Sequence, residues 1–232
     1  MKTMVITGGA GGIGSAIAKR FQKEGYSVVI GYNRSKEKAE ALAKEIGARA
    51  LFVDVCCPSS VSAFYEAAGP ASVVIHAAGV AQQKLFCDIT EEEWDRMMDV
   101  HVKGAYRLYK AFLPDMIRAK AGSLLSISSM WGQVGASCEV HYSTAKAALI
   151  GMTRALAKEL GPSNIRVNCI APGVIETDMM AAFSEEDKRA LMEETPLGRI
   201  GTGEDVADAA LYAAEASFLT GQVIAPNGGF VI

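Results

Sequence analysis

The stretch Met4-Val5-Ile6-Thr7-Gly8-Gly9-Ala10-Gly11-Gly12-Ile13-Gly14 decides the fold of this chain. It joins an apolar, β-rich run to a helical pattern through a turn that consists mostly of glycine. Such a turn leaves backbone N–H groups and the positive end of the helix facing one side, which is where a pyrophosphate binds. The turn matches G-x-G-x-x-G from Gly9 and T-G-x-x-x-G-x-G from Thr7. Either match alone is weak evidence, because a tight strand-to-helix turn also needs glycine for packing.

Apolar runs and helical patterns alternate along the rest of the sequence. Strands are expected at residues 4–7, 28–30, 50–53, 73–75, 124–127, 167–170 and 223–225, and helices at 12–24, 35–46, 91–119, 140–160 and 204–214. The connection 58–69 has room for about three helical turns. Alternating strands and helices indicate right-handed crossovers and a parallel sheet that is covered on both faces. We therefore predict a single-domain, Rossmann-like α/β fold over residues 1–232: a doubly wound, seven-stranded parallel sheet with helices on both faces.

Size, charge and cysteine content limit the classes of protein to which this chain can belong. Its 232 residues are 50% hydrophobic and carry a net charge of −3, without a dense Lys/Arg cluster. One sizeable core and no nucleic-acid partner are expected. No apolar run approaches the roughly 18 residues of a membrane span, so we expect a cytoplasmic protein with no membrane partner. The five cysteines are scattered without ligand spacing, which predicts reduced thiols and no metal site.

The end of the second expected strand indicates which dinucleotide is bound. Sites that prefer NAD place Asp or Glu there to bind the ribose hydroxyl, whereas this chain has Gly31-Tyr32-Asn33-Arg34-Ser35. With no carboxylate to repel it and Arg34 to pair with it, a 2′-phosphate is favoured. We predict NADP(H), the alternative being that Arg34 is only a solvated helix start. Asp54, after the third strand, is expected to accept a hydrogen bond from adenine or else to start the next helix.

Tyr142 and Lys146 lie four residues apart in an expected helix, and Ser129 precedes the tyrosine by thirteen residues. Residues i and i+4 share a helix face, so the phenol and the ammonium point into one cleft. A ketone that receives a hydride needs a proton donor and a hydrogen-bond donor at its oxygen. We expect Tyr142 to supply the proton and Ser129 to polarise the carbonyl. The charge of Lys146 is expected to lower the pKa of the phenol from about 10.

These residues match the motifs of a known family. The chain resembles the classical short-chain dehydrogenases/reductases in Thr7-Gly8-x3-Gly12-x-Gly14, Asp54, Ala78-Gly79, Ser129, Tyr142-x3-Lys146, Arg166-Val167-Asn168 and Pro172-Gly173, over essentially all of its length. The resemblance implies that Lys146 also binds the nicotinamide ribose, and that the segment after the sixth strand holds the carboxamide. The implied cofactor-binding residues are Thr7, Gly8, Gly12, Ile13, Gly14, Asn33, Arg34, Ser35, Asp54, Val55, Ala78, Gly79, Tyr142, Lys146, Pro172, Gly173, Ile175 and Thr177.

Two histidines depart from the pattern of that family. The usual Asn-Asn-Ala-Gly is His76-Ala77-Ala78-Gly79 here, and His101 replaces the Asn of the long helix. In the family, that Asn holds a water in a proton relay between the lysine and solvent. His101 is able to take over, because imidazole donates, accepts and titrates near neutrality. We therefore count His101 with Ser129, Tyr142 and Lys146 as catalytic, the alternative being a residue that only fills volume while catalysis is slower.

The substrate pocket is expected between the serine and the tyrosine and in a mobile flap at residues 176–203. Its predicted lining is Trp131, Gln133, Cys138, Glu139, Met179 and Phe183. In general pattern the chain is similar to bacterial 3-oxoacyl-acyl-carrier-protein reductases of fatty acid biosynthesis, which implies a ketone carried on an acidic protein. Of two basic positions that such enzymes present to the carrier, this chain has Lys120 but Ser163. The acidic flap repels an acidic carrier, unless its charges form only a solvated helix face.

The run 129–142 also resembles a Gram-positive subgroup that reduces a 5-aminopentanone adduct on a lysine of translation elongation factor P. Glu139 and the acidic flap offer a charge rationale for such an amine-bearing substrate. A third interpretation is a regulator that binds NADP without catalysis, which the intact Ser129, Tyr142 and Lys146 argue against. The family resemblance implies a homotetramer or a dimer.

Overall fold

The computed structural model describes residues 2–177, 180 and 184–232. Seven parallel strands form one sheet in the order β3-β2-β1-β4-β5-β6-β7. The strands are β1 (Thr3–Thr7), β2 (Ser27–Tyr32), β3 (Arg49–Phe52), β4 (Val73–His76), β5 (Gly122–Ile127), β6 (Ile165–Ile170) and β7 (Val223–Ile224). After β3 the chain crosses back past β1, so the strand order reverses between β1 and β4. The predicted doubly wound, Rossmann-like sheet is confirmed.

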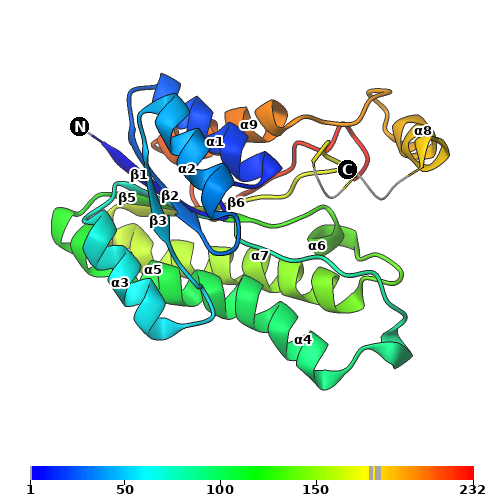
Figure 1. Ribbon diagram of the computed structural model, residues 1–232, viewed down its shortest axis with the longest axis horizontal. Coiled ribbons are helices and arrows are strands. Elements are labelled where there is room, and N and C mark those ends of the chain that lie inside the picture. Colours follow the sequence, from blue (N-terminus) through cyan, green and yellow to red (C-terminus); the bar gives the residue numbers. More distant parts are fainter. Residues whose placement is uncertain (1, 178–179, 181–183) are drawn as a thin grey trace.

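Helices cover both faces of the sheet (Figure 1). The first face carries α1 (Gly12–Lys23), α2 (Lys36–Ile46) and α9 (Gly203–Glu215), and the second carries α3 (Pro58–Ala68), α5 (Gly104–Ala119) and α7 (Val140–Leu160). Neighbouring residues of β1 point into different cores: Met4 and Ile6 belong to one apolar cluster and Val5 to the other. A strand that is buried on both sides has no polar face, which is why the strands are continuous apolar runs in the sequence.

The predicted helix 91–119 is confirmed in its bounds, but a π-helical turn divides it. The helix α4 (Glu91–Met98) starts at a capping box formed by Thr90 and Glu93 and is followed by the π-helical turn (Asp99–Lys103), after which α5 begins. The wider turn directs His101 inward, where the side chain is 1% exposed. A Cβ on Gly104 would lie 3.1 Å from His76 Cε1, so the helix backbone at Gly104 packs closely against the last residue of β4. Turns of this kind are frequent at functional sites.

The segment 176–203, which was predicted as an irregular flap, contains a helix. The helix α8 (Glu185–Glu194) begins with a capping box and stands away from the sheet (Figure 1). None of its residues is buried, so it lacks the apolar stripe by which periodicity detects a helix. The base of the segment is held by Ile175 and Gly201, whose backbones form an isolated parallel bridge. The mobility of the segment stays a prediction.

Short elements complete the fold. The third crossover helix α3 has 11 residues, or about three turns, as expected from the length of its connection. The chain also forms a four-residue helix, α6 (Trp131–Val134), and a 3-10 turn, η1 (Phe86–Asp88). Within the described residues, no helix has the length and apolar character that crossing a membrane requires.

Candidate active site

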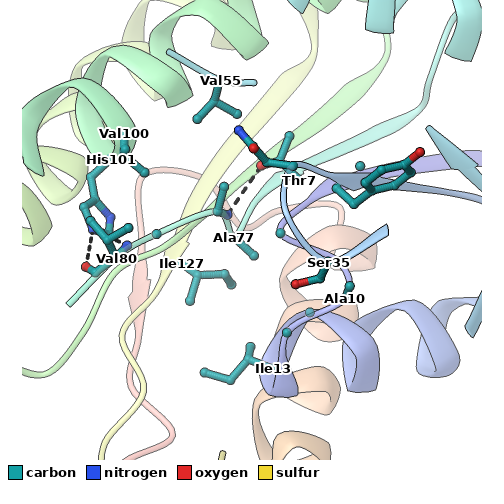
Figure 2. Close-up of a pocket in the computed structure, with 18 of the residues that line it drawn as sticks. Thr7, Ala10, Ile13, Ser35, Val55, Ala77, Val80, Val100, His101 and Ile127 are labelled. Atoms are coloured by element: carbon teal, nitrogen blue, oxygen red, sulfur yellow. Dashed lines mark hydrogen bonds between the residues drawn. The ribbon is translucent and has the colours of Figure 1, made fainter. Parts of the chain in front are cut away.

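A cavity of about 600 Å³ opens above the carboxyl ends of β1 to β4, beside the first turn of α1. In parallel α/β sheets, ligands bind at this edge, near the point where the strand order reverses. Ala10 and Ser35 face His101 and Val80 across the cavity (Figure 2). Most of the predicted cofactor residues line it, together with His101: Thr7, Gly8, Gly12, Ile13, Gly14, Asn33, Arg34, Ser35, Asp54, Val55, Ala78, Gly79, Tyr142, Lys146 and Thr177.

Three predicted cofactor residues are not among those that line this cavity. Pro172 O accepts a hydrogen bond from Met130 N (2.9 Å), and Gly173 N donates to Pro226 O (3.1 Å). Ile175 is 7% exposed and packs in the apolar core. Backbone pairing thus fixes the chain after β6 next to the site, whereas a direct role of these residues in cofactor binding stays a prediction.

The glycine turn admits an anion because it carries no side chains. Gly8 has a φ of 68°, and a Cβ on it would lie 2.7 Å from Ala78 Cα. A Cβ on Gly14 would lie 2.3 Å from Gly8 O, so the turn and α1 pack backbone against backbone. Gly11 caps α1 without a side-chain hydrogen bond, and the N–H groups of the first helical turn have no partner within the helix. These donors and the positive helix end fit a pyrophosphate.

The part of the cavity at the ends of β2 and β3 carries the charges that bear on dinucleotide choice. Arg34 is exposed and lines the cavity after β2. Asp54 Oδ1 accepts a hydrogen bond from Cys56 N (2.9 Å), so the carboxylate also shapes the loop after β3. Arg96 and Val100 line the same cavity, and the sequence prediction missed both. The signal that could have grouped these two residues is their i, i+4 spacing, which places both on one face of a helix.

The predicted catalytic side chains Ser129, Tyr142 and Lys146 come together at the start of α7. Lys146 Nζ lies 5.3 Å from the ring centroid of Tyr142 and donates a hydrogen bond to Ile127 O (2.8 Å). Ser129 Oγ accepts a hydrogen bond from Trp131 N (3.2 Å), and its interaction with the phenol lowers the pKa of Tyr142. Ser128 Oγ instead donates to Lys146 O (2.8 Å), so the hydroxyl of Ser128 is already hydrogen-bonded to the backbone of α7. The arrangement therefore leaves Ser129 as the serine that faces the phenol.

Burial is the main cause of the shifted pKa values of Tyr142 and Lys146. It raises the pKa of Tyr142 to about 12, with the hydrogen bond from Ser129 opposing the shift and the charge of Glu139 adding to it. Burial also lowers the pKa of Lys146 to about 8. The expectation that Lys146 lowers the pKa of the phenol was wrong for this arrangement. Desolvation disfavours both the phenolate and the ammonium, and the amine donates to a backbone carbonyl rather than to the phenol oxygen.

His101 also packs against the phenol ring of Tyr142. The rings of His101 and Tyr142 meet edge to face, with centroids 5.6 Å apart. His101 Nε2 lies 2.8 Å from Val80 O and 3.2 Å from Val80 N, whereas Nδ1 is buried without a hydrogen-bond partner among the described residues. Burial and the charge of Lys146 lower the pKa of His101 well below 6.5, so the ring is neutral. A Cβ on Gly79 would lie 2.5 Å from His101 Cε1, which explains the glycine.

The second unusual histidine, His76, joins the glycine turn to the neighbouring strand. His76 Nδ1 lies 3.0 Å from Thr7 Oγ1, at the end of β1, and the side chain is 1% exposed. Burial, aided by the charge of Lys146, lowers the pKa of His76 to about 3. The ring is therefore a neutral structural link, and it does not line the cavity.

We expect the free energy of unfolding to fall as the pH drops from about 6.5 toward 3, because His76 must stay neutral in the folded chain. Over that range the unfolded chain binds a proton that the folded chain does not, so acid favours unfolding, by up to about 1.4 kcal/mol per pH unit. Urea titrations at a series of pH values measure this. The His76→Asn variant keeps a polar group toward Thr7 and should show a shallower loss; an identical slope would contradict the assignment.

Four of the predicted substrate residues are described by the structure, and none of the four lines this cavity: Trp131, Gln133, Cys138 and Glu139. Trp131 packs edge to face on Phe230, and Gln133 is exposed. Cys138 has a φ of 62°, and Glu139 is half-buried beside the phenol. The remaining two predicted residues, Met179 and Phe183, lie outside the described residues.

The cysteines do not assemble into a site. All five are free thiols, at positions 56, 57, 87, 138 and 169. Across residues 2–177, 180 and 184–232, no group of three His, Cys, Asp or Glu side chains is placed to hold a metal ion.

The fold and the cavity define the class of a Rossmann-like oxidoreductase. A family model described as enoyl-(acyl carrier protein) reductase matches residues 8–231. The 3-oxoacyl-[acyl-carrier-protein] reductase FabG of Chlamydia muridarum is 40% identical, over 98% of this chain and 96% of its own. The uncharacterized oxidoreductase YmfI of Bacillus subtilis is 36% identical, over 99% and 98%. A short-chain type dehydrogenase/reductase from Mycobacterium ulcerans superposes with a TM-score of 0.94 at 31% identity, covering 99% of this chain and 89% of that one.

The chain belongs to the short-chain dehydrogenase/reductase family. It is therefore an oxidoreductase that interconverts CH–OH and C=O groups with a nicotinamide cofactor. The resemblance noted in the sequence and the expectation of an enzyme are both confirmed.

Proposed function

We propose that this chain reduces a 3-oxoacyl thioester to the 3-hydroxy form with NADPH. The observation that carries the proposal is the phenol of Tyr142, held between Ser129, Lys146 and His101 at the edge of a cavity that fits a dinucleotide. The relatives named 3-oxoacyl-[acyl-carrier-protein] reductase, at up to 40% identity over nearly the whole chain, support the substrate class. The proposed unit is one domain of residues 1–232, located in the cytoplasm.

In the proposed reaction, a side chain of the protein supplies the proton. A bound nicotinamide dinucleotide supplies the hydride. Tyr142 Oη donates its proton to the oxygen of the substrate carbonyl, and its pKa of about 12 keeps that proton in place at neutral pH. The hydroxyl of Ser129 donates a hydrogen bond to the same oxygen, where negative charge develops. Lys146, whose amine is buried beside the ring, binds the ribose and stabilises negative charge on the phenol after the transfer.

We also propose that His101 passes protons between the Lys146 side of the site and solvent. Its ring is neutral, lines the cavity and is anchored at Nε2 by the backbone of Val80. Nδ1 has no hydrogen-bond partner in the described part of the chain, so it is available to a water or a ligand group. A neutral imidazole accepts at one nitrogen while it donates at the other, which is what such a transfer needs.

The charges around the cavity support NADP(H) over NAD(H). Arg34, Arg96 and Lys146 line it, against the carboxylate of Asp54. A 2′-phosphate adds up to two negative charges, which this surplus of cations favours. Arg34 follows β2, at the position where a binding site that prefers NAD carries an Asp or Glu.

The Arg34→Ala variant should raise KM for NADPH by about tenfold or more and leave KM for NADH nearly unchanged. A charge-assisted hydrogen bond contributes about 1.5–3 kcal/mol, and about 1.4 kcal/mol corresponds to a tenfold change. Initial rates with both cofactors, at saturating ketone, measure the effect. Equal losses with NADPH and NADH would show that Arg34 does not contact the 2′-phosphate.

The substrate assignment is tested by comparing ketones under the same NADPH concentration. Acetoacetyl thioesters of pantetheine and of an acyl carrier protein should both be reduced, with kcat/KM higher for the carrier form if a protein carrier is the partner. No turnover of either thioester, or of any simple ketone, would overturn the proposed function. It would favour the interpretation as an NADP-binding regulator.

A second candidate is a ketone that bears an amine, as in a 5-aminopentanone adduct on a lysine of elongation factor P. The observation in its favour is Glu139, whose negative charge contributes to the raised pKa of Tyr142 and which lies three residues before it. A carboxylate there attracts an ammonium group and repels an acidic carrier. Faster reduction of 5-amino-2-pentanone than of 2-pentanone, lost in Glu139→Gln, would favour this candidate over the acyl thioester.

Assembly into a homotetramer or a dimer is part of the proposal. Tyr212 on α9 and Phe218, between α9 and β7, are exposed aromatic side chains at the β7 end of the sheet. Exposed aromatic side chains of this size are typical of surfaces that another chain covers.

A further inference from the structure

A five-residue segment after β4, residues 80–84, is hydrogen-bonded to several of the elements near the phenol. It continues from Ala77–Gly79, which line the dinucleotide cavity. Four of its five residues make hydrogen bonds to other elements, and we call residues 80–84 the clamp segment. Its contacts reach the π-helical turn, α4, the first turn of α7 and the loop before α7.

The first contact fixes one face of the catalytic ring. Val80 holds His101 through its backbone, with 2.8 Å between His101 Nε2 and Val80 O. His101 in turn packs edge to face on Tyr142 at 5.6 Å between centroids. A shift of Val80 therefore moves the ring that the phenol rests against.

The second contact fixes the backbone next to the phenol. His141, the residue before Tyr142, is fully buried, and its Nε2 lies 3.1 Å from Gln82 Oε1. Gln82 Nε2 donates to Glu93 Oε1 (2.7 Å) on α4. Lys84 Nζ also donates to both oxygens of Glu93, at 2.9 and 2.7 Å.

The direction of these hydrogen bonds follows from Glu93. Hydrogen bonds from Lys84, Thr90 N and Gln82 lower the pKa of Glu93 to about 2, so its carboxylate only accepts. Gln82 must then turn its NH2 group to Glu93 and its carbonyl oxygen to His141. His141 must carry its proton on Nε2, which agrees with a buried Nδ1 that has no partner among the described residues. One carboxylate thus sets the amide orientation and the imidazole tautomer in sequence.

The third contact holds the loop that leads into α7. Lys84 N donates to Cys138 O (2.7 Å), which fixes a residue with positive φ, and Gln83 Nε2 donates to Glu139 Oε1 (3.2 Å). The clamp segment thereby also holds the loop that leads to Tyr142. His101, which packs on the phenol ring, and His141, which precedes Tyr142 in the chain, depend on residues only two positions apart in the clamp segment.

We propose that Gln82 and Glu93 are positioning residues that hold Tyr142 in the geometry for proton transfer, through the clamp segment and His141. The proposal rests on the proposed function, because it concerns the phenol that donates the proton. It follows from the two attachments on either side of Tyr142, since a proton transfer loses rate steeply when donor and acceptor are displaced.

The Gln82→Met variant keeps the size of the side chain but removes both hydrogen bonds, and Glu93→Gln removes the charge that orders them. Each should lower kcat for ketone reduction by about ten- to a hundredfold, while the dissociation constant of NADPH, measured by its fluorescence, changes less than about twofold. The double variant Gln82→Glu/Glu93→Gln exchanges the amide and the carboxylate and so restores both hydrogen bonds. The new carboxylate at position 82 accepts one from His141 and one from the new amide at position 93. It should recover most of the lost kcat.

The matched control is Thr90→Ala. It removes the hydroxyl that caps α4 at Glu93 N (3.2 Å) and leaves the Gln82 and Lys84 contacts in place. A lower unfolding midpoint with unchanged kcat is expected, because a helix cap stabilises without touching the phenol. If the single variants keep kcat, or if the double variant is no better than they are, the positioning role is overturned. A wild-type chain that binds NADPH but reduces no ketone would instead overturn the proposed function.

Discussion

The Tyr142→Phe variant should lose ketone reduction almost completely, with kcat lower by about 10³-fold. Phenylalanine keeps the ring that packs on His101 but lacks the hydroxyl that we propose as the proton donor. A positioned general acid contributes about 10²–10⁴-fold. The amine of Lys146 is hydrogen-bonded to Ile127 O, so we do not expect it to replace the phenol. Single-turnover rates with NADPH and an acetoacetyl thioester measure the loss.

NADPH binding provides the control for this variant. The cavity is lined mainly by backbone and side chains of β1 to β4 and α1, which the change leaves in place, so the dissociation constant should stay within about threefold of wild type. Retained binding with lost turnover also separates the enzyme from a regulator. If the variant still reduces ketones at a comparable rate, another donor acts and the assignment of Tyr142 is wrong.

The Gly14→Ala variant should lose most of its affinity for NADPH and part of its stability. The new methyl would lie 2.3 Å from Gly8 O and 2.8 Å from Gly9 Cα, and both are backbone atoms that cannot rotate away. The turn must shift, which moves the donors that face the pyrophosphate. Overpacking of this kind costs about 1–3 kcal/mol, and at about 1.4 kcal/mol per factor of ten the affinity falls by up to about a hundredfold. Fluorescence titration and thermal unfolding measure the two effects.

Gly151→Ala is the matched control for that change. Gly151 lies within α7, is exposed, and a Cβ on it would meet nothing within 4 Å. Alanine is the better helix residue by about 0.5–1 kcal/mol, so NADPH affinity should be unchanged and the unfolding midpoint slightly higher. Gly14→Ala with wild-type affinity would mean that the turn adapts without moving its N–H groups, and that the backbone contact is not decisive.

The fold was predictable because its signals are local. Strands buried on both faces, such as β1 with Met4 and Val5 in opposite cores, appear as apolar runs whatever their neighbours are. The helix α7 was predicted at its observed bounds, Val140–Leu160, because its pattern is uninterrupted. The helix α8 was not predicted, because a helix without a buried residue leaves no apolar period to detect.

The site was predictable in its membership but not in its electrostatics. Ser129, Tyr142 and Lys146 do gather, as their spacing indicated, and the glycine turn faces the cavity. The direction of the pKa of Tyr142 was wrong, because burial, not the neighbouring charge, dominates it. Arg96 was missed as a lining residue, because its i, i+4 spacing with Val100 indicates a shared helix face but not that this face borders the cavity.

The sequence by itself determined the parallel sheet, the glycine turn and the family, because periodicity, glycine spacing and motif order are carried by neighbouring residues. Only the tertiary structure decided that a π-helical turn sets His101 against Tyr142 and that the clamp segment joins them. It also decided that Glu93 orders Gln82 and His141 from a different helix. These features depend on burial and on contacts between residues distant along the chain, and such contacts exist only after the layers have packed.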